Sequence, residues 1–266
     1  MNNQAIGVLD SGLGGLTVMR ALMHLLPHEN IIYVGDTLHC PYGEKTPKQI
    51  EKYVTEIADF LVAKKIKLLV LACNTATVLT LELLQQRLSI PVIGMINAAS
   101  YAALQTSQTR KIGVIATEAT VQTAKYTKTL RELDSDSQII EQACPVFVRL
   151  VEQGLSHTEE AYLIAEQTLN NLSQTGIDTL ILGCTHFPMM SEAIQSVMPN
   201  CYLIDPSQKV AEEVFKTLHD LQLLNNQKKQ GLYQLYITKE EALFAELANL
   251  WLQVKFSLEE ISLDAK

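Results

Sequence analysis

Two cysteines stand at matching places in two similar stretches of the chain, and a pair of thiols can act as acid and base. Cys73 follows the strand-like run 67–72, and Cys184 follows the strand-like run 178–183. Such runs are typical of buried parallel strands that deliver a side chain to the rim of a sheet. At the start of a following helix, the helix dipole lowers a thiol pKa from about 8.5 toward neutrality. We therefore expect both thiols to exchange protons near neutral pH.

A second pair of similar segments indicates an internal duplication. Residues 6–11 read Ile-Gly-Val-Leu-Asp-Ser and residues 112–117 read Ile-Gly-Val-Ile-Ala-Thr, at nearly the same offset as the two cysteines. Like units usually associate about an approximate two-fold axis. Such pairing would make Cys73 and Cys184 face each other across a cleft.

The elements that must position these residues alternate between strand-like runs and helical periodicity, which is typical of a parallel sheet covered by helices. We predict an α/β fold with two pseudo-symmetric, doubly wound lobes, each with a mostly parallel four-stranded sheet, and a boundary near residues 97–100. The predicted strands are 5–9, 31–34, 67–72, 91–94, 112–115, 138–143, 178–183 and 201–204.

Two further regions have clear helical signals. Thr46, Pro47 and Gln49 together predict the capped start of a helix, because threonine can cap it, proline suits its first position and glutamine completes a capping box. From about Ala211 the sequence predicts a helix, a strand at 232–237 and another helix that continues through Trp251.

Polar residues follow the first predicted strand. In an open parallel sheet the ligand crevice lies at the carboxyl ends of the strands. Asp10, Ser11 and the glycine-rich turn 12–15 stand at that place. The backbone N–H groups of this turn could hold a carboxylate, or the glycines could simply make a tight turn. Because position 17 is threonine and no Walker lysine follows, the turn fits neither a dinucleotide fingerprint nor a P-loop.

The remaining cysteines and one histidine have less specific contexts. Cys144 and Cys201 stand in apolar or turn-like segments and are interpreted as small buried hydrophobes, whereas the role of Cys40 stays open. His186 comes two residues after Cys184, so it could be a core histidine or a local acid and hydrogen-bond donor.

Composition excludes several classes of protein. The net charge is −8 with scattered acidic residues, which gives no electrostatic footprint for nucleic acid and favours a small-molecule substrate. The five cysteines show no CxxC spacing, so neither a disulfide framework nor a zinc site is indicated. No signal sequence or membrane-length apolar run is present, so we expect a cytoplasmic protein.

Four motifs stand in one order and register along the chain. They are Asp10-Ser-Gly-Leu-Gly-Gly, Gly35-Asp36-Thr37 with Pro41-Tyr42-Gly43, Ala72-Cys73-Asn74-Thr75-Ala76, and Gly183-Cys184-Thr185-His186-Phe187-Pro188. With this spacing, from Ile6 to about Ala211, the chain resembles the glutamate racemases of the aspartate/glutamate racemase family. The resemblance implies an active site between the lobes, no cofactor, and a role in supplying D-glutamate for peptidoglycan.

The resemblance also implies roles for individual residues. Cys73 and Cys184 would be the catalytic acid/base pair, with Asp10 beside one thiol and with Glu152 and His186 beside the other. The substrate-binding residues would be Asp10, Ser11, Pro41, Tyr42, Gly43, Asn74, Thr75, Thr185 and His186. The C-terminal segment would return to the first lobe, which would comprise residues 1–97 and 208–266, while residues 98–207 would form the second lobe.

This chain departs from the family pattern at three positions. His39 and Cys40 stand before the Pro-Tyr-Gly turn, where the family commonly has arginine. Arg149 stands where a small or neutral residue is more usual. These side chains could alter loop closure or an effector response.

The two thiols suit the reaction that the resemblance implies. Racemisation needs a proton to leave one face of a carbon and another to arrive at the opposite face, and two facing thiols meet that need. Aspartate racemase or a related cysteine-pair isomerase stays open, because one methylene separates the substrates. A cysteine hydrolase and a non-catalytic amino-acid-binding protein are also open, as is a homodimer.

Overall fold

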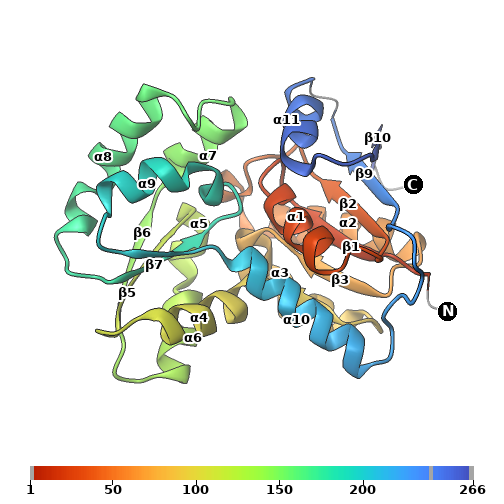
Figure 1. Ribbon diagram of the computed structural model, residues 1–266, viewed down its shortest axis with the longest axis horizontal. Helices are drawn as coiled ribbons and strands as arrows, with labels where there is room; N and C mark the ends of the chain where they lie inside the picture. The colour runs from red at the N-terminus through yellow and green to blue at the C-terminus, as the bar shows by residue number, and fades with distance from the viewer. Residues whose placement is uncertain (1–2, 240–241, 264–266) are drawn as a thin grey trace.

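Two parallel β-sheets form the framework of the protein. The computed structural model describes residues 3–239 and 242–263 of the chain. The strands of the first sheet are β1 (Ile6–Asp10), β2 (Ile31–Gly35), β3 (Leu68–Leu71), β4 (Val92–Gly94), β9 (Tyr233–Ile237) and β10 (Ser257–Glu260). The strands of the second sheet are β5 (Lys111–Ala116), β6 (Gln138–Ala143), β7 (Thr179–Gly183) and β8 (Tyr202–Ile204). Figure 1 shows the two sheets side by side, each in its own lobe.

The strand orders show how the two lobes resemble each other. The first sheet has the order β10-β9-β2-β1-β3-β4, and the second has the order β6-β5-β7-β8. The central strands β1 and β5 occupy equivalent places, as do β3 and β7, which precede the two cysteines. The α/β prediction is confirmed, and each of the eight predicted strands is present within one residue at either end.

The first sheet has six strands rather than the four predicted, whereas the second sheet has the predicted four. β9 was predicted as a strand, and it pairs in parallel with β2, so the C-terminal segment returns to the first lobe. β10 was not predicted, because its sequence Ser-Leu-Glu-Glu is short, acidic and mostly exposed. It lies at the edge of the sheet, where a strand needs only one apolar contact face.

Helices cover both faces of the first sheet. These helices are α1 (Leu16–Leu25), α2 (Pro47–Ala63), α3 (Asn74–Arg87), α10 (Pro206–Asp220) and α11 (Ala242–Leu252). Val8 packs in the same cluster as α1, α10 and α11, whereas its neighbour Leu9 packs with α2 and α3 on the opposite face. This alternation follows from the two-residue period of a strand. The predicted capping box of α2 is confirmed at Thr46 and Gln49.

The second sheet is also covered on both faces. The helices of this region are α4 (Met95–Thr106), α5 (Glu118–Thr123), α6 (Lys125–Leu133), α7 (Pro145–Glu152), α8 (Glu159–Ser173) and α9 (Ser191–Val197). α4 and α6 pack on one face, and α7, α8 and α9 pack on the other. Two short 3₁₀ helices complete the fold, η1 (Tyr42–Glu44) and η2 (Phe187–Met190).

The two lobes share buried apolar contacts. One core cluster contains Leu16 of α1 together with Phe147 of α7, so the packing is continuous from lobe to lobe. α10 leaves the second sheet after β8 and packs against α1 of the first lobe and α4. The residue boundaries 97/98 and 207/208 between the lobes stay a prediction.

A buried ion pair ties the C-terminal segment to the first sheet. Lys67 Nζ lies 2.6 Å from Glu29 Oε2 and donates to the carbonyl of Leu223 at 2.7 Å, while Glu29 Oε1 accepts the Asn225 N–H at 2.7 Å. The two charged side chains are 1% and 2% exposed. Because Leu223 and Asn225 both belong to the segment that leads from α10 to β9, the ion pair fixes that segment against the first lobe.

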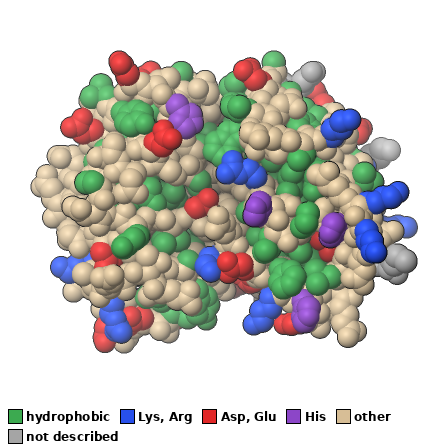
Figure 2. Space-filling view, in the orientation of Figure 1, with side chains coloured by type: hydrophobic (Ala, Val, Ile, Leu, Met, Phe, Trp, Pro, Cys, Tyr) green, Lys and Arg blue, Asp and Glu red, His purple; other side chains and the backbone are tan. Residues whose placement is uncertain are grey.

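The surface carries charges of both signs. Figure 2 shows acidic and basic side chains scattered over the face that it draws. Within residues 3–239 and 242–263, the structure contains no helix that is both long and apolar enough to cross a membrane.

Candidate active site

The carboxyl ends of β1, β3, β5 and β7 meet at a small cavity between the lobes. Its volume, including space open to solvent, is about 250 Å³. The lining residues are Ser11, Pro41, Tyr42, Gly43, Cys73, Asn74, Thr75, Thr117, Val148, Cys184, Thr185 and His186. Ten of these were singled out in the sequence. The other two singled-out residues, Asp10 and Glu152, lie directly behind the lining and hydrogen-bond to Thr185 and His186.

Cys73 reaches the cavity as the N-cap of α3. Its Sγ accepts a hydrogen bond from the Ala76 N–H at 3.5 Å, and the Ser11 side chain contacts it. Burial, and then the nearby charge of Asp10, raise the pKa of this thiol to about 12. The expectation of a thiol pKa near neutrality is therefore wrong for Cys73, because desolvation outweighs the helix N-terminus. With its pKa raised in this way, the Cys73 thiol holds its proton at neutral pH.

Cys184 has a different environment. It does not cap an α-helix, since β7 is followed first by the 3₁₀ helix η2 and only then by α9. Instead, Cys184 Sγ lies 3.5 Å from His186 Nδ1, and His186 Nε2 lies 2.5 Å from Glu152 Oε1. An imidazolium in this place can stabilise a thiolate through a charge-assisted hydrogen bond.

The charge state of His186 follows from its neighbours. Burial alone would lower the pKa of the imidazole, but contacts with Cys184, Cys40 and Glu152 raise it well above its usual value. Burial would likewise raise the pKa of Glu152, but the contact with His186 leaves it below its usual value. An ion pair between His186 and Glu152 therefore stands behind Cys184.

Asp10 joins the first lobe to the second. Its carboxylate accepts hydrogen bonds from the Gly12 N–H at 3.1 Å and from Thr185 Oγ1 at 3.2 Å. Burial raises the pKa of Asp10 to about 6, against the lowering effect of His186. A Cβ on Gly14 would collide with Thr185 and His186, so the glycine-rich turn is needed for this close approach of the lobes.

Asn74 presents an unused donor at the cavity. The Tyr126 hydroxyl donates to Asn74 Oδ1 at 2.7 Å, and this contact fixes which way the amide faces. In the described part of the chain, the buried Asn74 Nδ2 has no hydrogen-bond partner. Such a donor is costly to bury unless a bound molecule satisfies it.

A cluster of threonine hydroxyls lies beside Asn74. Thr75 Oγ1 lies 2.8 Å from Thr117 Oγ1, which donates to Thr120 Oγ1 at 3.0 Å. Thr117 was not predicted as a site residue. The duplication offered a signal, because Thr117 ends the second copy of the repeated segment where Ser11 ends the first. Val148 and Tyr126 carried no such signal.

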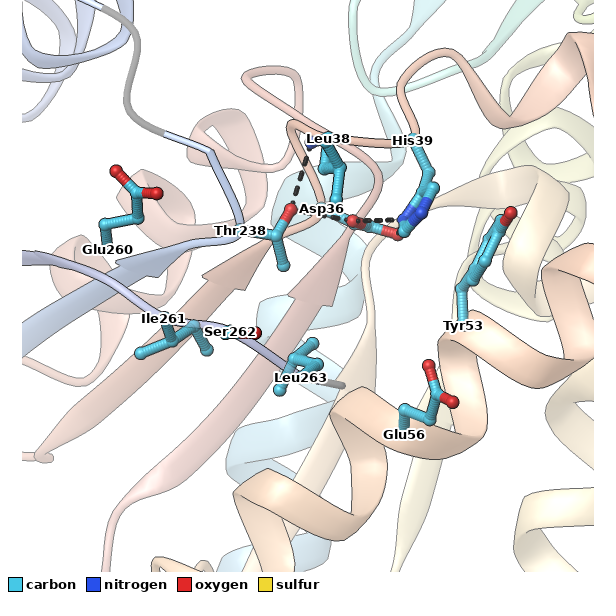
Figure 3. Close-up of a pocket in the computed structure, with 10 residues that line it drawn as sticks. All are labelled: Asp36, Leu38, His39, Tyr53, Glu56, Thr238, Glu260, Ile261, Ser262 and Leu263. Carbon is cyan, nitrogen blue, oxygen red and sulfur yellow. Dashed lines mark hydrogen bonds and ion pairs between the residues drawn. The ribbon is translucent and has the colours of Figure 1, made fainter. Parts of the chain in front are cut away.

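A second network orders the loop that carries Pro41, Tyr42 and Gly43. Asp36 Oδ2 accepts from the Tyr42 hydroxyl at 2.7 Å, and Asp36 Oδ1 accepts from Thr238 Oγ1 at 2.8 Å. Figure 3 shows His39 and Thr238 pointing at Asp36 beside a separate pocket of about 570 Å³. Thr238, the residue after β9, thus helps to position a side chain of the cavity.

The three departures from the family pattern lie around this loop. His39 hydrogen-bonds to Asp36 at 2.9 Å and stacks on Tyr53 with 3.7 Å between ring centroids. Cys40 Sγ donates to Glu152 Oε1 at 3.5 Å, and Arg149 pairs with Glu44 at 2.7 Å on the exposed surface. The contacts of Cys40 and Arg149 both connect the two lobes.

Known proteins with similar sequences and folds were compared with this chain. The family model described as Asp/Glu/Hydantoin racemase matches residues 6–214. A glutamate racemase from Geobacter metallireducens is 39% identical over 99% of this chain and 98% of its own length.

Solved structures agree with the sequence comparison. The crystal structure of a glutamate racemase isoform from Bacillus anthracis has a TM-score of 0.96 and 37% identity over the whole of both chains. The glutamate racemase from Francisella tularensis, solved in complex with D-glutamate, has a TM-score of 0.93 and 33% identity over the whole of both chains. An aspartate racemase homologue from Pyrococcus horikoshii is only 18% identical, with a TM-score of 0.57 over 81% of this chain, and shares the fold alone.

These matches span nearly the full length of the chain and its relatives, and the cavity brings together the residues of all four sequence motifs. The chain belongs to the Asp/Glu/Hydantoin racemase family.

Proposed function

We propose that this protein interconverts L-glutamate and D-glutamate without a cofactor, with Cys73 and Cys184 as its two acid/base groups. The observation that carries the proposal is one small cavity that receives a thiol from each lobe. The glutamate specificity is supported by the glutamate racemases that match this chain over nearly its full length. In the cytoplasm, this reaction would supply D-glutamate for peptidoglycan.

The proposed reaction moves one proton at each face of the α-carbon. Starting from L-glutamate, the Cys184 thiolate takes the α-proton and the Cys73 thiol donates a proton to the opposite face. The buried Cys73, whose pKa is raised to about 12, suits the donor role. His186 lies 3.5 Å from Cys184 Sγ and also hydrogen-bonds to Glu152, which places a proton-carrying group beside that thiol. For D-glutamate the roles of the thiols are exchanged.

The planar intermediate carries negative charge that extends onto the α-carboxylate. Donors fixed in place before the reaction stabilise such charge without reorganisation. Asn74 Nδ2 is a free donor at the cavity wall, and Ser11, Thr75, Thr117 and Thr185 add hydroxyl groups. The carboxylate of Asp10 stands within reach of the same wall and would balance the substrate ammonium group.

The test is a chiral amino-acid assay with purified protein, supplied separately with the L and D isomers of glutamate and aspartate. We expect conversion of both glutamate isomers to the racemic mixture and little conversion of aspartate. Faster conversion of aspartate than of glutamate would show that the protein is an aspartate racemase. Binding without any change of configuration would identify an amino-acid-binding protein instead.

Labelling from solvent should show two bases rather than one. In D₂O, the reaction from L-glutamate should place deuterium at the α-carbon of D-glutamate, while the remaining L-glutamate stays protiated at early times. Starting from D-glutamate, the pattern should reverse. Mass spectrometry of chirally separated early samples measures both pools. Equal early labelling of the two pools would contradict the assignment of facing thiols.

Removal of metals and dialysable cofactors should leave activity unchanged. The proposed chemistry uses protein thiols and hydrogen-bond donors only, so no electron sink or Lewis acid is needed. We expect full activity after exhaustive dialysis against a chelator, and no pyridoxal absorbance. Activity that is lost on dialysis and restored by a divalent metal would refute this cofactor-free route.

Tyr126→Phe should weaken substrate binding more than it slows turnover. The change removes the hydroxyl that orients the Asn74 amide but keeps the buried ring. Loss of one such hydrogen bond costs about 0.5–1.5 kcal/mol, so KM should rise roughly 2–10-fold. Steady-state kinetics with both glutamate isomers measures the change. An unchanged KM would show that Tyr126 does not position Asn74.

A further inference from the structure

Cys40 lies beside Glu152 and His186, but the proposed racemisation gives Cys40 itself no role. Cys40 Sγ, Glu152 Oε1 and His186 Nε2 all lie within 4.8 Å of one another. The three side chains stand next to the cavity, but Cys40 does not line it. We propose that Cys40, Glu152 and His186 form a binding site for a thiophilic metal ion such as Zn²⁺, and that the bound ion inhibits the enzyme.

The three donors are of the kinds that zinc prefers. Zinc binds thiolate sulfur, imidazole nitrogen and carboxylate oxygen, and three protein ligands leave one position for water. In a tetrahedral zinc site the sulfur and oxygen ligands lie about 3.6 Å apart. Cys40 Sγ and Glu152 Oε1 are already 3.5 Å apart. The 2.5 Å contact between Glu152 and His186 has to open to about 3.4 Å, because the metal replaces the proton between them.

Charge balance favours a divalent ion at this place. Metal ligands bind in their deprotonated forms, so the Cys40 thiol proton and the His186 Nε2 proton leave to solvent. Two protons are replaced by one ion of charge +2, and the net charge of the cluster does not change. The site therefore avoids the cost of burying an uncompensated charge.

Occupancy would act on the reaction in two ways. Nε2 belongs to the imidazole whose Nδ1 lies 3.5 Å from Cys184 Sγ. A metal ion on Nε2 would replace the contact with Glu152 and hold this ring by a new bond beside Cys184. In addition, Cys40 comes from the loop after β2, whereas Glu152 ends α7 and His186 follows β7. The ion would tie the two lobes together beside the cavity and hinder any separation of the lobes during substrate exchange.

The sequence contains no closely spaced set of zinc ligands, so this site was not expected from it. The three side chains come from three distant segments of the sequence, so no local pattern of cysteines and histidines indicates a metal site. Metal binding rests on the geometry of the cluster alone, whereas its inhibitory consequence rests on the function proposed above.

The experiment first measures binding, independently of activity. Chelator-treated protein is titrated with Co²⁺, and the thiolate-to-cobalt charge-transfer absorption reports a bound cysteine. We expect this absorption in the wild type, its displacement by Zn²⁺, and its loss in Cys40→Ser. Affinity should fall more than about 100-fold, which exceeds the roughly 10–100-fold effect of losing an outer-shell partner. Cys201→Ser is the matched control, since Cys201 is also buried but stands apart from the cluster.

Activity is measured second, on the same variants. Zn²⁺ should inhibit the wild type and Cys201→Ser, and Cys40→Ser should keep its basal activity and resist inhibition. Cys40→Ala, checked for folding by circular dichroism, replaces the serine variant if that variant does not fold. Charge-transfer absorption that persists in Cys40→Ser, or disappears in Cys73→Ser, would place the metal on the catalytic thiols and overturn the site. Cobalt binding through Cys40 in a protein that does not racemise glutamate would refute only the proposed function.

Discussion

Replacing either catalytic thiol by serine is expected to reduce racemisation by about 10²–10⁴-fold, the usual contribution of a positioned general acid or base. A serine hydroxyl is a far weaker acid than a thiol and cannot exchange a proton at neutral pH. Because each turnover uses both groups, Cys73→Ser and Cys184→Ser should each show the loss in both directions. Chiral analysis of long incubations measures such low rates.

Two buried cysteines provide the controls. Cys144 and Cys201 do not line the cavity, so Cys144→Ser and Cys201→Ser should reduce stability at most. Circular dichroism and thermal unfolding of all four variants separate loss of chemistry from loss of fold. Wild-type turnover in a folded Cys73→Ser or Cys184→Ser variant would rule out the two-thiol mechanism.

The second large effect concerns stability rather than activity. Lys67→Met is expected to lower the free energy of unfolding by about 3–5 kcal/mol, because it leaves the Glu29 carboxylate buried without its partner. It also leaves the Leu223 carbonyl without its donor. Urea unfolding should show a lower midpoint at an unchanged slope.

An exposed ion pair supplies the comparison. Arg87 and Asp59 lie 2.6 Å apart, but their side chains are 39% and 53% exposed. Arg87→Met should therefore lower the free energy of unfolding by no more than about 1 kcal/mol. If Lys67→Met and Arg87→Met lowered the free energy of unfolding by the same amount, burial would not explain the contribution of the Lys67 contact to stability. The double variant Lys67→Met, Glu29→Leu should regain part of the stability, since no charge remains unpaired.

Much of the framework could be predicted because its signals are local. The strand-like runs before Cys73 and Cys184, and the capping residues around Thr46, each lie within a few positions of one another. β10 was not predicted, because an edge strand needs little apolar surface and its sequence therefore has no clear strand pattern. The ion pair of Lys67 with Glu29 escaped because its partners meet only after the chain has folded.

The cavity was predictable to a similar extent. The four motifs contain most of the residues that line it, including Ser11 and Asn74. The duplication could also have predicted Thr117. The pKa of Cys73 could not be read from its place before a helix, because desolvation depends on side chains contributed by distant segments. Cys40 likewise acquires its neighbours only through the approach of the second lobe.

The pairing of β9 with β2 has a consequence for the order of folding during synthesis. Strands β5 to β8 are contiguous in the sequence, so the whole second sheet can form while later residues are still being added. The first sheet has to wait for β9, and until then the edge of β2 exposes unpaired backbone groups. Such an edge is a template for pairing with other chains. A nascent chain therefore carries this open edge from the synthesis of β2 until β9 is added, and a ribosome-associated chaperone that covered the edge would protect the chain throughout that interval.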